Sequence, residues 1–275
     1  MRHFNRWLGA GALGICLLAA NVVQATTIVT LVDKNSSVQV DPRSSAGMFD
    51  WQVNQVDQLQ RQWFWYRIGA AGAESSIDTL AVPFAGITDT NFDGDSDTVY
   101  LRYTGAVLKA ELTFTLMGAG PGVMRSDIVE SIRLTNLSQG PLDLHFFQFC
   151  NLDLGGAPLD QSVGIAGGNT AQQQDISYFA SETVHTPLAT YRQVGFEPAI
   201  LNDLLDAAPT TLSNSVGPVG PGDLSWAFQW DMTLGAAGSG SDVVLISKDK
   251  QIVPEPLTAL LLGLGALMLR PRKSK

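Results

Sequence analysis

Large apolar side chains alternate with small or polar ones along many short stretches of this chain. Residues 224–234 keep this alternation throughout, and in residues 107–116 the apolar positions share one parity: Leu108, Ala110, Leu112, Phe114 and Leu116. Successive side chains of a β-strand point to opposite faces of its sheet, so a period of two is typical of a half-buried strand. The pattern therefore predicts a strand in both stretches.

The same reasoning predicts a fold built almost wholly of strands. Further strands are expected at residues 27–33, 58–68, 98–103, 127–136, 142–154, 175–180, 190–194 and 242–248. Residues 142–154 are apolar on both parities in their middle, which predicts a central strand covered on both faces. Gly- and Pro-rich turns separate the strands, and only residues 198–206 show helical spacing. Many short strands with little helix favour an all-β fold, an antiparallel two-sheet sandwich.

Glu130 interrupts the apolar parity of its predicted strand. It shares a face with Ile128, Ile132 and Leu134, so the pattern aims its carboxylate at the core. A buried carboxylate needs a raised pKa or a cationic partner. The alternatives are a general acid, a strand bulge, or a salt bridge with an arginine such as Arg125 or Arg102, and the last two are favoured.

The N-terminus has the features of a secretory signal peptide. Arg2 and Arg6 precede an apolar stretch at residues 7–20, and residues 23–25 offer small side chains for signal peptidase. This arrangement predicts a signal helix within residues 1–25 and cleavage before Thr26.

The C-terminus is a short polar motif, an apolar run and a basic end. Pro254, Glu255 and Pro256 precede apolar residues 257–269, and four basic residues follow: Arg270, Arg272, Lys273 and Lys275. As a helix the run is about 20 Å long, against about 30 Å for a bilayer core, so it is a marginal span. The basic end favours the cytoplasmic side and places the body outside. A simple anchor that is never cut is the alternative to processing.

This tail resembles the PEP-CTERM sorting signal of exopolysaccharide-producing Gram-negative bacteria. The resemblance rests on Pro254-Glu255-Pro256 placed directly against the apolar run, and it covers residues 253–275. It implies recognition and removal of the tail by an exosortase in the inner membrane. The expected route is export, a transient inner-membrane C-terminal anchor, and then the outer cell surface or extracellular matrix. Residues 62–67 and 145–147 also look like those of PEP-CTERM exported proteins, a likeness that implies no activity.

Removing both ends leaves an acidic body, residues 26–252. Of the 17 Lys and Arg residues two lie in the predicted signal and four in the tail, and of the 26 acids only Glu255 lies in the tail. The body thus has 11 basic and 25 acidic residues, a net charge of −14. Such a surface repels nucleic acid and anionic membrane, so no nucleic-acid partner is expected. Cys150 is the one cysteine of the body, and its apolar neighbours predict a buried thiol.

An acidic loop is the sharpest chemical motif. Asp89, Asn91, Asp93, Asp95 and Asp97 alternate with other residues, and Gly94 is the sixth residue of the run. Oxygen ligands at positions 1, 3 and 5 with glycine at 6 are typical of an EF-hand-type calcium loop. Tyr100 stands where the bidentate glutamate is required, so water or a distant acid would have to complete the site. A structural Ca²⁺ is predicted, and a solvated Asp/Gly turn is the alternative.

Trp63 and Trp65 offer a candidate sugar-binding strip. On a strand they share a face with Arg61 and Arg67, and if exposed they would form a platform for stacking sugars. The favoured alternative is a strand covered on both faces, with arginines reaching solvent.

Catalytic motifs are scarce, which favours a non-catalytic role. The body has neither a zinc-type histidine spacing nor a nucleophile elbow nor a phosphate loop. The sequence therefore predicts an exported structural or binding protein of the cell surface or exopolysaccharide matrix. A secreted carbohydrate-active enzyme that uses buried acids is the alternative, and a carbohydrate-binding module built on Trp63 and Trp65 is another.

Overall fold

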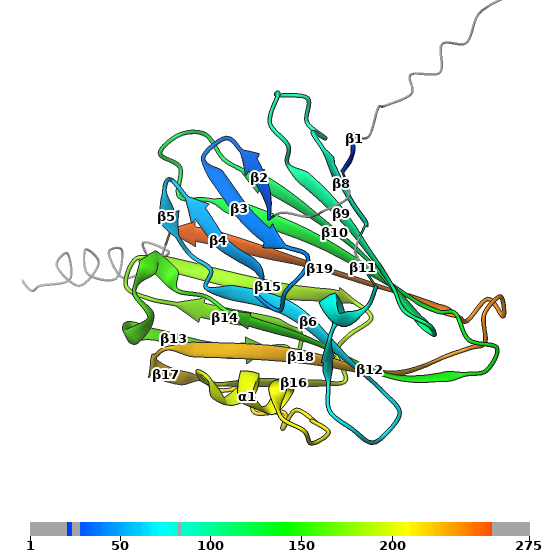
Figure 1. Cartoon of the computed structure of the whole chain (residues 1–275). Coiled ribbons are helices and arrows are strands. Elements are labelled where there is room, and N and C mark those ends of the chain that lie inside the picture. Colours follow the sequence, from blue (N-terminus) through cyan, green and yellow to red (C-terminus); the bar gives the residue numbers. More distant parts are fainter. Residues whose placement is uncertain (1–20, 24–27, 82–83, 255–275) are drawn as a thin grey trace, which may run out of the picture.

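The computed structural model describes residues 21–23, 28–81 and 84–254, in which two β-sheets pack face to face (Figure 1). Strand pairing in these residues is antiparallel except for a short parallel contact between two strands of the second sheet. The described part contains a single α-helix, α1 (Ala199–Leu205), which lies against that second sheet. This confirms the predicted all-β fold.

The first sheet, sheet A, has the C-terminal strand near its middle. In the described residues its order is β1 (Asn21–Val23), β8 (Phe84–Thr88), β9 (Thr98–Thr104), β10 (Leu108–Gly118), β11 (Ser126–Asn136), β19 (Val243–Pro254), β15 (Tyr178–Thr186), β14 (Thr170–Gln174), β13 (Gln161–Ala166) and β17 (Val219–Gly222). Strand β19 thus lies between β11 and β15 and joins the strands from β1 to β11 on one side to the strands from β15 to β17 on the other.

The second sheet, sheet B, contains the most apolar strands. In the described residues its order is β16 (Tyr191–Phe196), β18 (Leu224–Leu234), β12 (Leu142–Asn151), β6 (Arg61–Ile68), β4 (Gly47–Val53), β3 (Ser36–Asp41) and β2 (Val29–Asp33). Two short strands join this path, β5 (Val56–Asp57) on β4 and β7 (Ser75–Ser76) on β6. Strand β12 lies between β18 and β6, as its two-sided apolar pattern predicts.

Aromatic side chains fill the space between the sheets. Phe64 of β6 stacks on Phe114 of sheet A, with ring centroids 6.3 Å apart, and on Phe146 of β12 at 5.6 Å. All three rings are buried. Burial of large aromatic surfaces is the main stabilising contribution available to a body whose one described cysteine is free.

Several strands were missing from the sequence prediction, for two physical reasons. In β3 the inward positions begin with the polar Ser36, and the pairing of β3 with β4 shifts register between Ser37 and Gln39. In β14 the inward positions are Ala171 and Gln173, so a small and a polar side chain hide the alternation. The predicted strand at 175–180 overlaps only the start of β15, while the helix at 198–206 matches α1 closely.

The predicted ends of the body differ from the observed strands. Strand β1 lies within residues 1–25, the predicted signal, and pairs with β8. Strand β19 continues two residues beyond residue 252 and ends at Pro254, which pairs with Tyr178 of β15. The predicted signal helix and the apolar run at 257–269 otherwise lie outside the described residues. Among those described, no helix is both long and apolar enough to cross a membrane.

Candidate functional site

The acidic loop of residues 89–97 connects β8 to β9 and is tied to two neighbouring strands. Val32 of β2 donates a backbone hydrogen bond to Ser96 O at 2.9 Å, and Leu116 of β10 donates one to Asp97 O at 2.9 Å. The loop therefore has a fixed position at one edge of the sandwich.

Asp97 holds the loop together from inside. Its carboxylate is only 2% exposed. It accepts hydrogen bonds from the backbone N–H groups of Thr90 and Asn91 at 3.1 and 3.2 Å, and from the hydroxyls of Thr90 and Thr98 at 2.7 Å. These donors occupy the oxygens that a bound cation would need.

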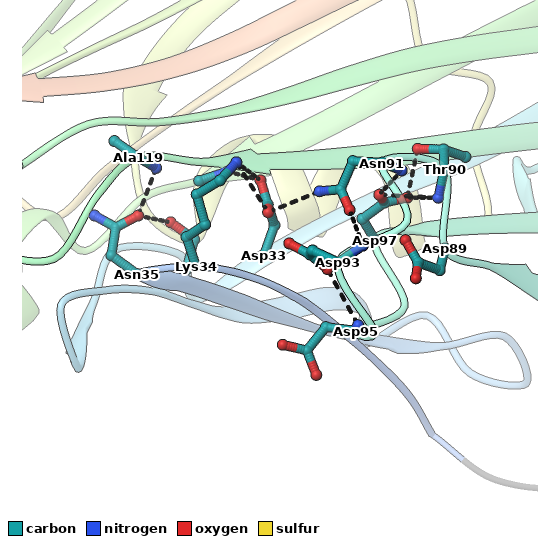
Figure 2. A network of polar contacts seen from close by, with 12 residues as sticks. Asp33, Lys34, Asn35, Asp89, Thr90, Asn91, Asp93, Asp95, Asp97 and Ala119 are labelled. Carbon is teal, nitrogen blue, oxygen red and sulfur yellow. Dashed lines mark hydrogen bonds and ion pairs between the residues drawn. The ribbon is translucent and has the colours of Figure 1, made fainter.

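The other predicted calcium ligands accept hydrogen bonds from the loop's own backbone. Asp89 accepts from the N–H of Phe92 at 2.6 Å and of Gly94 at 2.9 Å, while Asp93 accepts from the N–H of Asp95 at 3.1 Å. Gly94 has φ +104°, the left-handed conformation that suits glycine. Figure 2 shows the Asp95 carboxylate pointing away from those of its neighbours.

Asn91 links this loop to a buried carboxylate on β2. Its side-chain amide donates to Asp33 Oδ1 at 3.0 Å (Figure 2). Asp33 also accepts from the N–H of Gly118 at 2.6 Å. In the described residues no group of three or more His, Cys, Asp or Glu side chains is arranged to hold a metal ion. The five predicted ligands thus lie in one loop, but most of their oxygens bind N–H and O–H groups.

Trp63 and Trp65 do not form a surface strip. Their exposed fractions are 0% and 1%, so neither indole is available for stacking against a sugar. Trp65 packs edge-on against Phe149 of β12, with ring centroids 6.3 Å apart, and Trp63 donates to Asp78 Oδ1 at 3.0 Å. The alternative of a strand covered on both faces is therefore the correct one.

Glu130 is buried, as its parity predicts, but its cationic partners are lysines. Lys250 Nζ lies 2.5 Å from Glu130 Oε1, and Lys248 Nζ lies 2.7 Å from Glu130 Oε2. The expected partners bind elsewhere: Arg125 pairs with Asp127, and Arg102 lies over the Phe84 ring. Burial alone would raise the pKa of Glu130, but the two lysines outweigh burial and lower it.

A second glutamate completes a buried charged quartet, defined as Glu130, Glu182, Lys248 and Lys250. Glu182 lies 3.1 Å from Lys248 Nζ and 3.2 Å from Lys250 Nζ. All four side chains are at most 1% exposed. Amides from sheet B close the group, because Gln62 donates to Glu130 at 2.8 Å and Gln148 donates to Glu182 at 3.1 Å. The quartet is charge-balanced and sealed, so it has the features of a structural element.

A different acidic group gathers at one end of sheet B. Register pairing places Arg61, Asn151, Ser225 and Gly195 in one row across β6, β12, β18 and β16. Partners in register share a face of the sheet. Four carboxylates adjoin this row from the ends of the neighbouring segments, and we call them the acidic rim: Asp57, Asp153, Glu197 and Asp223.

Backbone hydrogen bonds fix the acidic rim. Glu197 N donates to Asp223 O at 3.0 Å, Asp153 N donates to Gln58 O at 3.1 Å, and Leu59 N donates to Asp57 Oδ1 at 3.1 Å. The Asn151 amide donates to Asp223 Oδ1 at 3.3 Å. Because these contacts hold the backbone, the rim does not depend on a flexible loop.

Three carboxyl groups of the acidic rim have raised pKa values. Burial, with the neighbouring charges of Asp223 and Asp57, raises the pKa of Asp153 to about 6. Burial also raises the pKa of Glu197, although the Ser225 hydroxyl and Arg61 act against it. Burial is again the main cause of the raised pKa of Asp57. Carboxyls with raised pKa values in one group are typical of functional sites.

Several polar atoms of this region are buried without a hydrogen bond. They are Asp153 Oδ1, Glu197 Oε2, Asn151 Oδ1 and Ser225 Oγ. Asn151 and Ser225 are fully buried, and the Ser225 hydroxyl is close enough to Glu197 to affect its pKa. Unpaired buried polar groups are costly, so these atoms make this end of sheet B less stable than a fully paired one.

The sequence offered no signal for the acidic rim. Its members lie in four segments far apart along the chain, and none stands in a recognisable motif. The two histidines of the body do not join it. His145 of β12 pairs with Asp231 at 2.7 Å, and His185 of β15 pairs with Asp249.

No known protein-family model and no curated protein sequence matches the chain. Several solved structures are similar to it. A bacterial glucoamylase complexed with acarbose has a TM-score of 0.55 and 6% identity over 86% of this chain and 32% of that one. A copper-containing benzylamine oxidase from Hansenula polymorpha has a TM-score of 0.45 and 9% identity, covering 82% of this chain and 59% of its own. A family GH92 α-mannosidase from Bacteroides thetaiotaomicron has a TM-score of 0.38 and 9% identity, covering 86% and 32%.

The likeness to the glucoamylase shows the fold alone. The chain spans about a third of the length of the glucoamylase it matches. What that enzyme binds is a property of that enzyme, and the β-sandwich is what the two chains share.

Proposed function

We propose that this protein is an exported, non-catalytic component of the cell surface or exopolysaccharide matrix, sorted by an exosortase that reads its C-terminus. The observation that supports it best is the end of β19. Pro254, the first residue of the Pro254-Glu255-Pro256 motif, is the last residue of this strand and is exposed. The motif thus starts at the exposed last residue of β19, where a membrane enzyme can reach Pro254 while the body stays folded.

The placement of β19 also gives the motif a rigid base. Residues 252 and 253 pair with Ala180 and Phe179 of β15, and Ile252 is buried. A cut on the C-terminal side of Pro254 would remove the apolar tail and leave the paired strand intact. The proposal therefore expects release of a stable body.

The test is the intact mass and location of the protein recovered from its native envelope. The proposal expects loss of residues 1–25 and of the apolar tail, and recovery outside the inner membrane. Glu255→Ala should give a longer protein retained in the inner membrane. A matched control, Asp249→Ala on the same strand, should be processed normally. Recovery of the native protein in the cytosol with Met1 and Lys275 present would contradict the proposal.

A second candidate, a carbohydrate-active enzyme, is favoured by one observation. Asp153 has a pKa of about 6 and lies beside other carboxylates, a combination that suits a general acid next to a base or nucleophile. Release of reducing sugar from the matrix polysaccharide, abolished by Asp153→Asn, would replace the non-catalytic proposal with this one.

A further inference from the structure

A primary amine and a primary amide meet at one oxygen of the buried charged quartet. Glu130 Oε2 lies 2.7 Å from Lys248 Nζ and accepts a hydrogen bond from Gln62 Nε2 at 2.8 Å. Lys248 belongs to β19 of sheet A and Gln62 to β6 of sheet B. The two side chains therefore meet across the space between the sheets, and one carboxylate holds both of them.

The Gln62 amide is held from its nitrogen side. The side chain is fully buried, and its carbonyl oxygen has no hydrogen-bond partner among the described residues. The carbonyl carbon Cδ is bonded to the nitrogen that Glu130 binds, and the flexible stem of Lys248 can bring Nζ onto it. Reactants held together in this way react far more readily than the same groups free in solution.

Burial makes a neutral amine accessible at this site. The side chains of Lys248 and Glu130 are both 0% exposed. The ion pair is the resting state, but moving one proton from the ammonium to the carboxylate replaces two buried charges with none. The sealed site also keeps out water that would compete for the carbonyl carbon. Because the reaction runs once per molecule, a small fraction of the neutral pair is enough.

We propose that Lys248 and Gln62 form an isopeptide bond that joins sheet A to sheet B, with Glu130 as the proton carrier. Glu130 takes one proton from the Lys248 ammonium, and the lone pair on Nζ then forms the bond to Gln62 Cδ. The bond from Cδ to Nε2 breaks with its electron pair on nitrogen. Glu130 passes a proton to this nitrogen and takes another from Nζ, so ammonia leaves.

The charges of the quartet stay balanced through this reaction. Glu130 ends with the first lysine proton, so the products are an amide, a carboxylic acid and neutral ammonia. Lys250 remains an ammonium and keeps its contact with Glu182 at 3.2 Å. The reaction consumes no oxidant, reductant or second substrate.

The quartet also contains a matched pair of side chains that serves as a control. Glu182 Oε2 lies 3.2 Å from Lys250 Nζ and accepts from Gln148 Nε2 at 3.1 Å. Both distances are longer than those at Glu130. Lys250 makes its shortest contact, 2.5 Å, with Glu130 Oε1, which is not the oxygen that binds Gln62. The bond is therefore expected at Gln62 and not at Gln148.

Mass spectrometry of the purified full chain, stored folded and then denatured, tests the bond. The intact mass should lie one ammonia below the value given by the sequence of the recovered chain. A protease that cuts before aspartate should yield a branched peptide that joins residues 57–77 to residues 242–248. These cuts leave Gln62 inside its peptide, so cyclisation of an N-terminal glutamine cannot imitate the loss.

Four variants show which side chains react. Gln62→Met and Lys248→Met should each restore the full mass and remove the branched peptide. Glu130→Gln should do the same, although both reacting side chains remain. The matched control Gln148→Met should keep both the ammonia loss and the branched peptide. Circular dichroism shows whether each variant is folded, and the peptide map of the unaltered protein decides the question where a variant is not.

Three results overturn the proposal. The first is a full mass for the unaltered folded protein, with no branched peptide. The second is a thioester between Gln62 and Cys150 as the source of the ammonia loss, and the third is a branch at Glu130 with loss of water. The bond is read from purified protein wherever the cell places it, so this proposal and the sorting proposal fail separately.

Discussion

Lys250 Nζ lies 2.5 Å from Glu130 Oε1, with both side chains sealed between the sheets. Burial lowers the pKa of Lys250, but the charges of Glu130 and Glu182 outweigh burial and raise it, so the lysine is charged in the folded protein. The two residues come from neighbouring strands, β11 and β19, and Gln62 of sheet B binds the same carboxylate. Both sheets therefore depend on this pair.

Removing one lysine should destabilise the body strongly. Lys250→Met would leave two buried carboxylates with Lys248 alone, and breaking a buried pair in this way costs about 3–5 kcal/mol. The free energy of unfolding in urea measures the change. The control Lys109→Met removes a partly exposed ion pair with Glu111, and it should cost less than about 1 kcal/mol. Equal losses in the two variants would contradict a structural role for the quartet.

Trp65→Ala should act on stability and leave sugar binding to the folded protein unchanged. The indole is buried against Phe149, and truncating a buried tryptophan costs about 3–5 kcal/mol. A lower melting temperature is expected. The exposed Phe92→Ala is the control, and its melting temperature should change little. Weaker sugar binding by folded Trp65→Ala would restore the tryptophan strip as a binding site.

Asp153→Asn should stabilise the protein above pH 6. The folded pKa of about 6 lies above the ordinary value of 3.8, so the folded state keeps a proton that the unfolded state has released. Stability conferred by Asp153 therefore falls as the pH rises from about 4 to about 6, and the cost is complete above that range. With allowance for partial exposure, we expect a gain of about 1 kcal/mol.

Melting scans at pH 4 and pH 7 measure this effect. The gain should be present at pH 7 and small at pH 4. Asp143→Asn, on the exposed start of β12, serves as the matched variant. A gain of the same size at both pH values would show that the unbalanced charge of the rim is not its cause.

Calcium should raise the melting temperature if the loop of residues 89–97 binds it. Weak sites of extracellular modules have Kd values of about 10⁻⁴–10⁻³ M, so millimolar calcium would stabilise by about 1 kcal/mol. Asp93→Asn should abolish the difference between calcium and EDTA while keeping the bond to the Asp95 N–H. Identical scans in calcium and EDTA would mean that the loop is held by its own hydrogen bonds.

Cys150 should resist thiol reagents until the protein unfolds. The side chain is fully buried and burial raises the pKa of its thiol, so thiolate is scarce. Labelling with a thiol reagent should follow the urea unfolding curve. Fast labelling in native buffer would mean that the space between the sheets opens.

Regular alternation of apolar and polar residues made the long strands predictable. The buried ion pairs and the acidic rim could not be predicted in this way, because they depend on contacts between distant segments. In β10 the apolar side chains lie at every second position and mark the buried face directly. In β18 the same alternation predicted a half-buried strand, but residues 224–230 are buried on both faces. The sequence pattern indicated part of the buried charged quartet. Glu130 stands between Ile128 and Ile132, and Lys248 and Lys250 stand between Ile246 and Ile252, on the apolar parity of their strands.

Charged residues on an apolar parity point to buried partners, but one strand cannot say which ones. Arg125 or Arg102 was the expected partner of Glu130, whereas sheet pairing supplies lysines more than 100 positions away. The acidic rim is harder still, since it exists only where β6, β12, β18 and β16 meet in register. For the calcium motif the sequence correctly placed the five residues in one loop. It could not show that most of their oxygens accept hydrogen bonds from the loop itself.

The place of β19 in sheet A has a consequence for the order in which the body can form. This strand is the last of the described chain to be synthesised, yet it lies between β11 and β15 and contributes both lysines of the quartet. Until residues 243–254 emerge, Glu130 and Glu182 have no counter-charge and the first sheet is divided in two. The two halves of the first sheet can therefore join only after the strand furthest along the described chain has been made.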